Sequence, residues 1–276
     1  MTDKVREVAV EEAENIKILT TQAVKSRAYI YPIHGLYYFV SHKSLWKPLG
    51  SKLAPTITLA IGVTTVMFLV AYVPQAAVLA FTNGPVAAIS AALLTLSESS
   101  TIANLLARTF LIEDALIDTF DGTLVSRECT SLVSDGREIK SGKDPIAKLG
   151  KLVKKPFAKF TPKALIRYLM YLPLNFIPVV GTFIFVLLQG KRYGPNAHAR
   201  YFQLKEWSKS QKDAFVEQNR AAYTSYGVVA ALLEMVPIAS IFFSFTNTVG
   251  AALWAADLEA KASTAPNLRD AAKKVQ

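Results

Sequence analysis

Long stretches without charged residues alternate with basic segments along the chain. The longest, residues 53–97, contains no Asp, Glu, Lys or Arg, and it is long enough for two transmembrane helices of about 20 residues each. The pattern predicts an all-α integral membrane protein with a single membrane domain at residues 53–259. Its four apolar blocks lie at residues 54–81, 84–112, 168–190 and 221–256.

The first two blocks are joined by residues that favour a turn. Asn83 and Gly84 readily adopt positive φ angles, and Pro85 suits the first turn of a new helix. We therefore expect residues 54–112 to form one long transmembrane helical hairpin.

The third block, residues 168–190, contains residues that interrupt helices. Pro173 and Pro178 each remove a backbone donor, and Gly181 follows them closely. Split near these prolines, the block gives two half-helices that are each too short to cross about 30 Å of hydrocarbon. Basic segments lie on both sides of the block, and such segments tend to stay on the cytoplasmic side. This favours a hairpin that enters the membrane partway and returns, and the alternative is a single kinked span.

The fourth block, residues 221–256, repeats features of the third. Residues 233–242 align with residues 174–183, so that Pro237 corresponds to Pro178. Paired apolar segments that are broken at corresponding positions are typical of transport folds, although apolar sequence of low diversity also matches by chance. We expect a second hairpin that penetrates partway, with its break at Pro237.

The remaining segments are polar or amphipathic. After the second block we expect an apolar helical face, with Asp114, Asp118 and Asp121 pointing away from it. Further on, Ser210 and an acidic residue three positions later have capping-box spacing and predict a helix start. The expected organisation outside the apolar blocks is a cytoplasmic or interfacial segment at 1–52, a basic amphipathic connector at 113–167, a basic connector at 191–220 and a disordered tail at 260–276.

Composition supports a membrane protein and excludes several other classes. Charged residues make up only 19% of the 276 residues, whereas soluble domains have about 25%. One cysteine and three histidines leave no basis for a disulfide framework or a metal site. No nucleophile with a base, phosphate-binding Gly loop or cofactor motif is recognisable, so we expect no enzyme. The net charge of +10 is better explained by cytoplasmic flanks of membrane segments than by nucleic acid.

Several short motifs occur in an order that resembles one membrane protein family. They are GLYYFVSHKSLWKPL at residues 35–49, STIAN at 100–104, FIPVVG at 176–181, MVPIASIFFSF at 235–245 and AALWAADLE at 251–259. Together they resemble the CysZ sulfate-permease and etoposide-induced membrane protein family, over roughly residues 32–259. The sequence is most similar to its fungal branch, which includes lipid-droplet and outer-spore-wall-related proteins.

The resemblance implies two long transmembrane helices, two hairpins that penetrate only partway, and both termini on the cytoplasmic side. The resemblance gives weaker support for an anion site. The bacterial permeases associate a Gly-Leu-Arg motif with the anion, but here Tyr37 follows Gly35 and Leu36, so the arginine of that motif is missing.

Glu98 is the charged residue that the pattern places deepest in the membrane. It lies about 21 Å from the Gly84 turn at 1.5 Å per residue, inside the hydrocarbon region if that turn is at the far interface. An intramembrane carboxylate is typical of an ion or proton pathway. The alternative is a carboxyl group that is protonated, or hydrogen bonded to neighbouring serines, within the helix bundle.

Four other polar residues in the apolar blocks are candidates for ion or polar contacts. Glu234 would lie near the headgroups in a shallow hairpin. Asn175 and Asn247 could satisfy backbone groups at the broken helices, or the half-helix that starts near Pro178 could direct its positive end at an anion. The four residues are Asn104, Asn175, Glu234 and Asn247.

Two features near the predicted interface have simple structural explanations. Arg108 is expected to extend its side chain to the near interface. The segment around His34 and His42 is rich in Tyr and Trp, which predicts an aromatic belt at the membrane surface.

Two functions from different classes remain. The first is a non-catalytic membrane protein of the endoplasmic reticulum that can move onto lipid droplets, with a part in spore-wall or lipid metabolism implied only by the resemblance. The second is a small-anion permease on the same scaffold. Membrane lipids are the expected partners, a homo-oligomer and a small anion are further candidates, and neither a cofactor nor nucleic acid is expected.

Overall fold

Helices make up most of the protein in this computed structural model, which describes residues 20–142, 144–152, 180–236 and 239–273. The α-helices are α2 (Tyr31–Ser41), α3 (Trp46–Val70), α4 (Tyr72–Asn83), α5 (Ala87–Leu106), α6 (Glu113–Ser126), α7 (Thr130–Ser134), α9 (Val180–Ala197), α10 (Ala199–Leu204), α11 (Lys209–Gln218), α12 (Arg220–Glu234) and α13 (Ser240–Lys273). Short 3-10 turns lie at Ala28–Ile30, Lys43–Leu45 and Gly84–Val86, and a π-helical turn lies at Ala107–Leu111.

The prediction of an all-α fold is wrong in one small respect. Strands β1 (Arg137–Ile139) and β2 (Leu149–Leu152) pair antiparallel and form a two-stranded sheet beside α6. Strands this short have too few residues to display an alternating pattern, so their sequence carries little signal.

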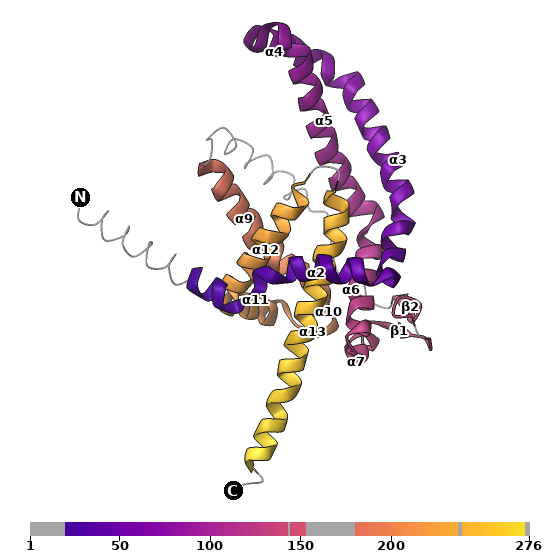
Figure 1. Cartoon of the computed structure of the whole chain (residues 1–276), viewed down its shortest axis with the longest axis vertical. Coiled ribbons are helices and arrows are strands. Elements are labelled where there is room, and N and C mark those ends of the chain that lie inside the picture. The colour runs from indigo at the N-terminus through magenta and orange to yellow at the C-terminus, as the bar shows by residue number, and fades with distance from the viewer. Residues whose placement is uncertain (1–19, 143, 153–179, 237–238, 274–276) are drawn as a thin grey trace, which may run out of the picture.

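Among the described residues, two helical segments are long and apolar enough to cross a membrane, Lys43–Val70 and Tyr72–Leu111. In Figure 1 they form the upper part of the molecule, where α3 and α5 rise away from the other helices. The chain bends at Ala71 and reverses at Gly84, whose φ of 55° is the positive value expected for an Asn-Gly turn. Many large apolar side chains on these helices are exposed, which agrees with the predicted membrane segments.

The helix α6 lies in the core of the lower part of the molecule and follows α5 through the π-helical turn. Ile117, Phe120 and Leu124 are buried on it, as its apolar spacing predicts. Asp114 is exposed, but Asp121 has no solvent exposure, so the prediction that it points away from the core is wrong. Two arginines, 16 and 79 positions further along the chain, compensate its charge.

The helices α9 and α12 approach each other very closely. A Cβ atom on Gly227 would lie 2.0 Å from the backbone oxygen of Gly190, and one on Gly194 would lie 2.0 Å from that of Tyr223. Glycine is required at this crossing because any side chain would push the two backbones apart. The contact joins the second half of the third apolar block to the first half of the fourth.

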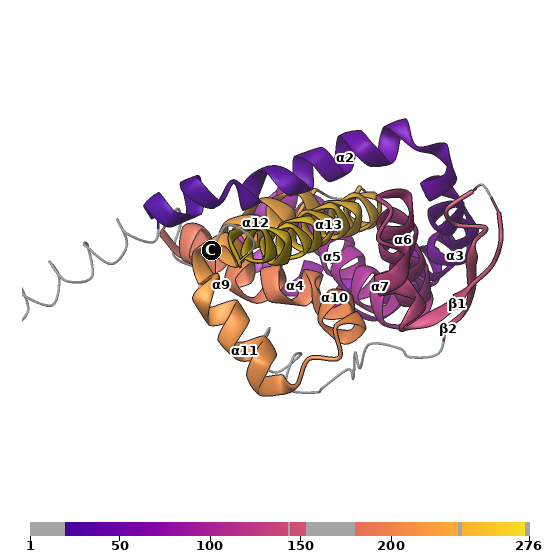
Figure 2. The ribbon, with the colours of Figure 1, turned by 90° about the horizontal axis from the view of Figure 1, so that it is seen from below.

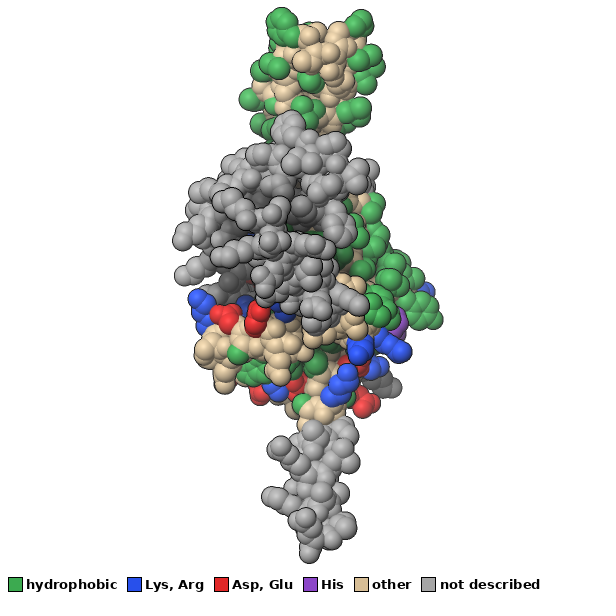
Figure 3. Space-filling view, turned by 90° about the vertical axis from the view of Figure 1, so that its left-hand side faces the viewer, with side chains coloured by type: hydrophobic (Ala, Val, Ile, Leu, Met, Phe, Trp, Pro, Cys, Tyr) green, Lys and Arg blue, Asp and Glu red, His purple; other side chains and the backbone are tan. Residues whose placement is uncertain are grey.

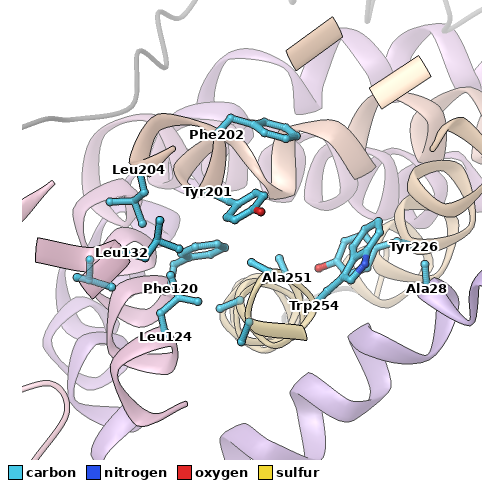
Figure 4. Close-up of a cluster of buried hydrophobic side chains, with 14 of the residues drawn as sticks. Ala28, Phe120, Leu124, Leu132, Tyr201, Phe202, Leu204, Tyr226, Ala251 and Trp254 are labelled. Atoms are coloured by element: carbon cyan, nitrogen blue, oxygen red, sulfur yellow. The ribbon is translucent and has the colours of Figure 1, made fainter. Parts of the chain in front are cut away.

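The core around α13 is aromatic. The ring of Trp254 on α13 lies 5.6 Å from that of Tyr226 and 4.8 Å from that of Tyr223, both on α12. Figure 4 shows Trp254 and Tyr226 on one side of α13 and Phe120 of α6 on the other. The helix α13 is therefore packed on two sides along its first turns.

The predicted helix breaks have different outcomes. The chain leaves helix between α12 and α13, although Pro237 itself lies outside the described residues, as do Pro173 and Pro178. Gly181 lies in the first turn of α9, and the residues before it, where the helix break is predicted, lie outside the described residues. A glycine this close to a helix start interrupts few backbone hydrogen bonds, because the first amides have no helical acceptor.

Two further details differ from the sequence expectations. The capping box of α11 is formed by Ser208 and Gln211, two residues before the predicted position at Ser210. The tail was expected to be disordered, but α13 continues as a helix to Lys273. A helix that is already formed and packed extends without a new nucleation step, so a polar sequence can continue it.

Candidate functional site

A cluster of polar side chains lies where the lower end of α5 meets α9, α12 and α13. It includes three of the residues that the sequence singles out, Asn104, Glu234 and Asn247. The full set, called the polar cluster below, is Asn104, Arg108, Tyr193, Glu234, Ser240, Ser244 and Asn247.

The carboxylate of Glu234 is the centre of the polar cluster. Its Oε2 accepts a hydrogen bond from Arg108 Nη2, and its Oε1 accepts from the hydroxyl of Tyr193. Asn247 Nδ2 donates to the same Oε1 over 3.0 Å. The side chain of Glu234 is only 10% exposed, so these three donors replace the water that an ionised carboxylate requires.

The amide of Asn247 is fixed in orientation but incompletely paired. Its Nδ2 donates to the Ala230 backbone oxygen over 3.0 Å as well as to Glu234, and the Tyr226 hydroxyl donates to the Asn247 backbone oxygen over 2.6 Å. Its Oδ1 is buried and has no partner among the residues that the structure describes. An acceptor of this kind can bind a buried water or one donor of a small polar molecule.

The polar cluster also ties α5 to the start of α13. The hydroxyl of Ser240 donates to Asn104 Oδ1 over 2.9 Å, and Arg108 Nη2 donates to the hydroxyl of Ser244. Arg108, which was expected to extend toward the near interface, thus pairs with Glu234 while its side chain stays 35% exposed. The π-helical turn that contains Arg108 is the structural signal at this position, since such turns are frequent at functional sites.

Glu98 is separate from the polar cluster. Gln75 of α4 donates through Nε2 to Glu98 Oε2 over 2.6 Å, and Thr95 donates to Gln75 Oε1 over 2.8 Å. The neighbouring Ser99 donates instead to the Thr95 backbone oxygen. In the described part of the chain Glu98 thus bonds to a glutamine on the facing helix rather than to the neighbouring serines, and Asn175 lies outside the described residues.

Asp121 binds two arginines, one of which precedes the third apolar block in the sequence and the other of which follows it. Arg200 donates from Nη2 to Asp121 Oδ2 over 2.7 Å and from Nε to Oδ1 over 2.9 Å. Arg137 Nη1 lies 3.1 Å from the same Oδ2 and 2.9 Å from Asp118 Oδ1. Arg137 and Arg200 are almost fully buried, so this contact fixes both ends of the segment between them on α6.

His198 is buried in the aromatic core and is uncharged. Its Nε2 lies 2.9 Å from the Ala251 backbone oxygen and its Nδ1 lies 2.9 Å from the Tyr223 hydroxyl. A carbonyl can only accept, so Nε2 carries the proton and Nδ1 accepts from Tyr223. Burial lowers the pKa of His198 to about 4. His34 and His42, in contrast, are exposed on and beside α2.

Comparison with known proteins identifies relatives over most of the chain. Residues 31–244 match the family described as sulfate transporter CysZ/etoposide-induced protein 2.4. The outer spore wall protein RRT8 of Saccharomyces cerevisiae is 26% identical over 250 residues, which cover 84% of this chain and 72% of that protein. The outer spore wall protein LDS1 of the same yeast is 26% identical over 108 residues, covering 37% of this chain and 33% of that protein.

Proposed function

Because this chain belongs to the sulfate transporter CysZ/etoposide-induced protein 2.4 family, we propose that it is a non-catalytic, multi-pass protein of the endoplasmic reticulum and the lipid-droplet surface. Every apolar segment would enter from the cytoplasmic face and return to it, and both termini would be cytoplasmic. The names of the yeast relatives support a link to the outer spore wall, and a link to lipid metabolism is part of the same proposal.

The contact at Asp121 is the observation that carries this topology. Arg137 precedes the third apolar block, Arg200 follows it, and both bind the same carboxylate. A segment whose two ends meet at one side chain leaves and returns on the same side of the protein. This supports a hairpin that penetrates partway over the single kinked span. The helix α12 has 15 residues, or about 22 Å, which is also less than the hydrocarbon thickness.

The distribution of charge supports a lipid-droplet surface. In Figure 3 the charged side chains lie around the lower half of the molecule, while the upper end formed by α3 to α5 carries apolar and uncharged groups. Residues 53–97 contain no charge, and Thr82 and Asn83 are the polar residues that precede Gly84 at the turn. Such a projection requires no aqueous compartment beyond it, so neutral lipid under a monolayer can accommodate it.

Imaging tests this proposal. The chain, tagged at its C-terminus, is expressed in yeast that are loaded with fatty acid and stained with a neutral-lipid dye, and the cells are followed into sporulation. We expect rings around the stained droplets. A useful control carries Val78→Lys and Phe81→Lys at exposed positions of α4, which should keep the chain out of the droplet monolayer. Staining of bilayers alone under lipid loading would contradict the droplet assignment.

A small-anion permease is the second candidate, and the partly exposed Arg108 beside the unpaired Asn247 Oδ1 is the observation in its favour. It ranks second because Glu234 already neutralises Arg108. Sulfate uptake into proteoliposomes tests it, with Glu98→Gln and Arg108→Gln as the variants. Uptake no faster than into protein-free vesicles would remove this candidate.

A further inference from the structure

The helix α2 lies crosswise at the foot of α3, along the outer edge of the molecule (Figures 1 and 2). Its inner face is clamped onto α13. A Cβ atom on Gly35 would lie 2.4 Å from the backbone nitrogen of Gly250, and the Tyr31 hydroxyl donates to Asp257 Oδ2 over 2.7 Å. Contacts this close hold the helix in one rotation about its axis, so its outer face has a fixed direction.

The outer face of α2 is apolar and uncovered. Ile33 is 54% exposed, Tyr37 is 77% exposed and Val40 is 51% exposed, and their spacing places them on one side of the helix. This stripe continues through the half-exposed Trp46 to the exposed apolar side chains at the start of α3, beginning with Leu53. Exposed apolar side chains therefore occur both on α2 and on α3, the helix proposed to enter the lipid.

The charged residues that flank α2 in the sequence all have one sign, and the carboxylate of Asp257 contacts the helix through Tyr31 on its inner side. No Asp or Glu occurs between residues 15 and 97, whereas Lys25, Arg27 and Lys43 are exposed at the two ends of α2. None of these three forms an ion pair with the described part of the chain. An apolar face flanked by unpaired cations complements the headgroup region of an anionic lipid surface.

We propose that α2 is an interfacial helix, whose outer face lies among the headgroups of a lipid surface that contains anionic lipids. The inference rests on the membrane topology proposed above, since α3 sets the depth of α2. It adds a second lipid contact, parallel to the surface, to the one made by the hydrophobic hairpin. Because α2 is clamped to α13, this contact holds the whole helical bundle against the lipid surface.

Depth-dependent fluorescence quenching in proteoliposomes tests the proposal. Single cysteines are introduced into a Cys129→Ala background as Tyr37→Cys on α2, Leu69→Cys on α3 and Asp213→Cys on α11, and each is labelled with an environment-sensitive dye. All three positions are exposed, so the substitutions disturb little packing. The vesicles contain phosphatidylcholine with or without phosphatidylserine, and spin-labelled lipids carry the quencher near the headgroup or deep in the acyl chain.

The dye at 37 should be quenched by the headgroup spin label more than by the deep one, the dye at 69 by the deep one, and the dye at 213 by neither. Leaving out phosphatidylserine, or replacing Lys25, Arg27 and Lys43 together with Gln, should lower quenching at 37 but not at 69. Quenching at 37 that is as weak as at 213 would overturn the proposal. A dye at 37 that is shielded from water yet unquenched would contradict the lipid contact and assign the outer face to a second copy of the chain. Quenching at 37 that does not change with phosphatidylserine or with the Lys25, Arg27 and Lys43 substitutions would contradict the requirement for anionic lipid. Loss of quenching at 69 would contradict the membrane topology itself.

Discussion

At the scale of single residues, buried charged side chains that compensate one another should contribute most to the stability of the fold. Asp121 has no exposed surface, yet its two carboxylate oxygens bind two guanidinium groups that are themselves buried. Removing one member of such a set leaves uncompensated charge, which is far more destabilising than losing an exposed pair. Glu234 with Arg108 follows the same rule in the polar cluster.

Replacing Asp121 with Asn should therefore destabilise the fold strongly. Arg137 and Arg200 would remain buried with reduced compensation, and we expect a loss of about 3–5 kcal/mol in the free energy of unfolding. Denaturant titration of the detergent-solubilised protein measures the loss. Asp118→Asn is the matched control, because Asp118 binds the same Arg137 but is 41% exposed, and it should cost less than about 1 kcal/mol. Equal losses in the two variants would contradict this account of Asp121.

His198 should make the stability of the fold depend on pH. Its pKa falls from 6.5 in the unfolded chain to about 4 in the fold, because burial disfavours the imidazolium. Between these values the unfolded state binds more protons, so stability is complete above pH 6.5 and declines as the pH falls toward 4. The decline is about 1.4 kcal/mol per pH unit at most, or on the order of 3 kcal/mol in total.

Thermal unfolding between pH 7.5 and 4.5 measures this dependence. His198→Gln lowers stability at neutral pH, because one of the two hydrogen bonds is lost, but it should flatten the dependence in this window. The exposed His34→Gln should leave the slope as in the parent protein. An unchanged slope in His198→Gln would show that other groups carry the pH dependence.

Sequence reasoning finds such residues but not their partners. Glu234, Asn104 and Asn247 stand out because they are polar residues in apolar blocks, and the structure brings them together. Arg108 and Tyr193 were missed as members of the same cluster, because Arg108 is 126 positions from Glu234 and periodicity reports only local spacing.

The predicted position of the α11 cap was wrong by two residues for a local reason, since Ser208 and Ser210 both precede an acceptor residue by three positions.

At the scale of helices, glycine contacts and the polar cluster assemble the lower bundle in different ways. Gly190, Gly194 and Gly227 allow α9 and α12 to meet backbone to backbone, which maximises van der Waals contact between the two helices. The polar cluster then attaches this helix pair to α5. The Gly-x-x-x-Gly spacing at 190–194 is readable in the sequence, but its partner Gly227 is not.

Gly227→Ala should therefore separate α9 from α12. The new Cβ would lie 2.0 Å from the Gly190 oxygen, and overpacking against a backbone atom is expected to cost about 3 kcal/mol. Gly62→Ala on α3 is the matched control, because nothing lies within 4 Å of its Cβ, and it should be neutral or stabilise by up to about 1 kcal/mol. Unfolding in detergent compares the two, and equal stabilities would rule out a required close contact.

Arg108→Gln should loosen the attachment of α5 to α12 and α13. Glu234 would be left buried without its cation, which is expected to cost about 2–4 kcal/mol because Arg108 is itself partly exposed. Arg127→Gln serves as the control, since its pair with Asp257 is exposed on both sides and should contribute less than about 1 kcal/mol. The double variant Arg108→Leu with Glu234→Leu should recover part of the loss. A loss as small as that of Arg127→Gln would contradict the attachment role.

At the scale of the whole molecule, charge and hydropathy predict the arrangement better than they predict the details. The Asn-Gly turn and the family resemblance are confirmed, and two described helical segments that could span a membrane lie where the first two apolar blocks predict them, because long apolar runs are readable from composition alone. The two-stranded sheet and the helical tail were missed, since each depends on packing against elements that the local sequence does not specify. The side of the membrane on which the flanking segments of a block lie decides whether that block crosses the membrane.

Single-cysteine labelling should place four positions on one side of the membrane. In a Cys129→Ala background, Gln22→Cys, Ser141→Cys, Asp213→Cys and Lys261→Cys introduce exposed thiols before and after each apolar block that the structure folds into the lower bundle. A membrane-impermeant maleimide added to sealed vesicles with their cytoplasmic face outward should label all four. Asn83→Cys, at the turn of the long apolar hairpin, should resist labelling until the vesicles are opened or dissolved.

The pair at 141 and 213 is decisive, because these positions lie on either side of the third apolar block. If that block crosses the membrane once, one of them must be protected while the other reacts. Such a result would also require Arg137 and Arg200 to be separated by the bilayer, which is incompatible with their shared contact on Asp121. Labelling at both positions in sealed vesicles, with the same labelling in protein that also carries Asp118→Asn, would establish that the block returns to the side from which it entered.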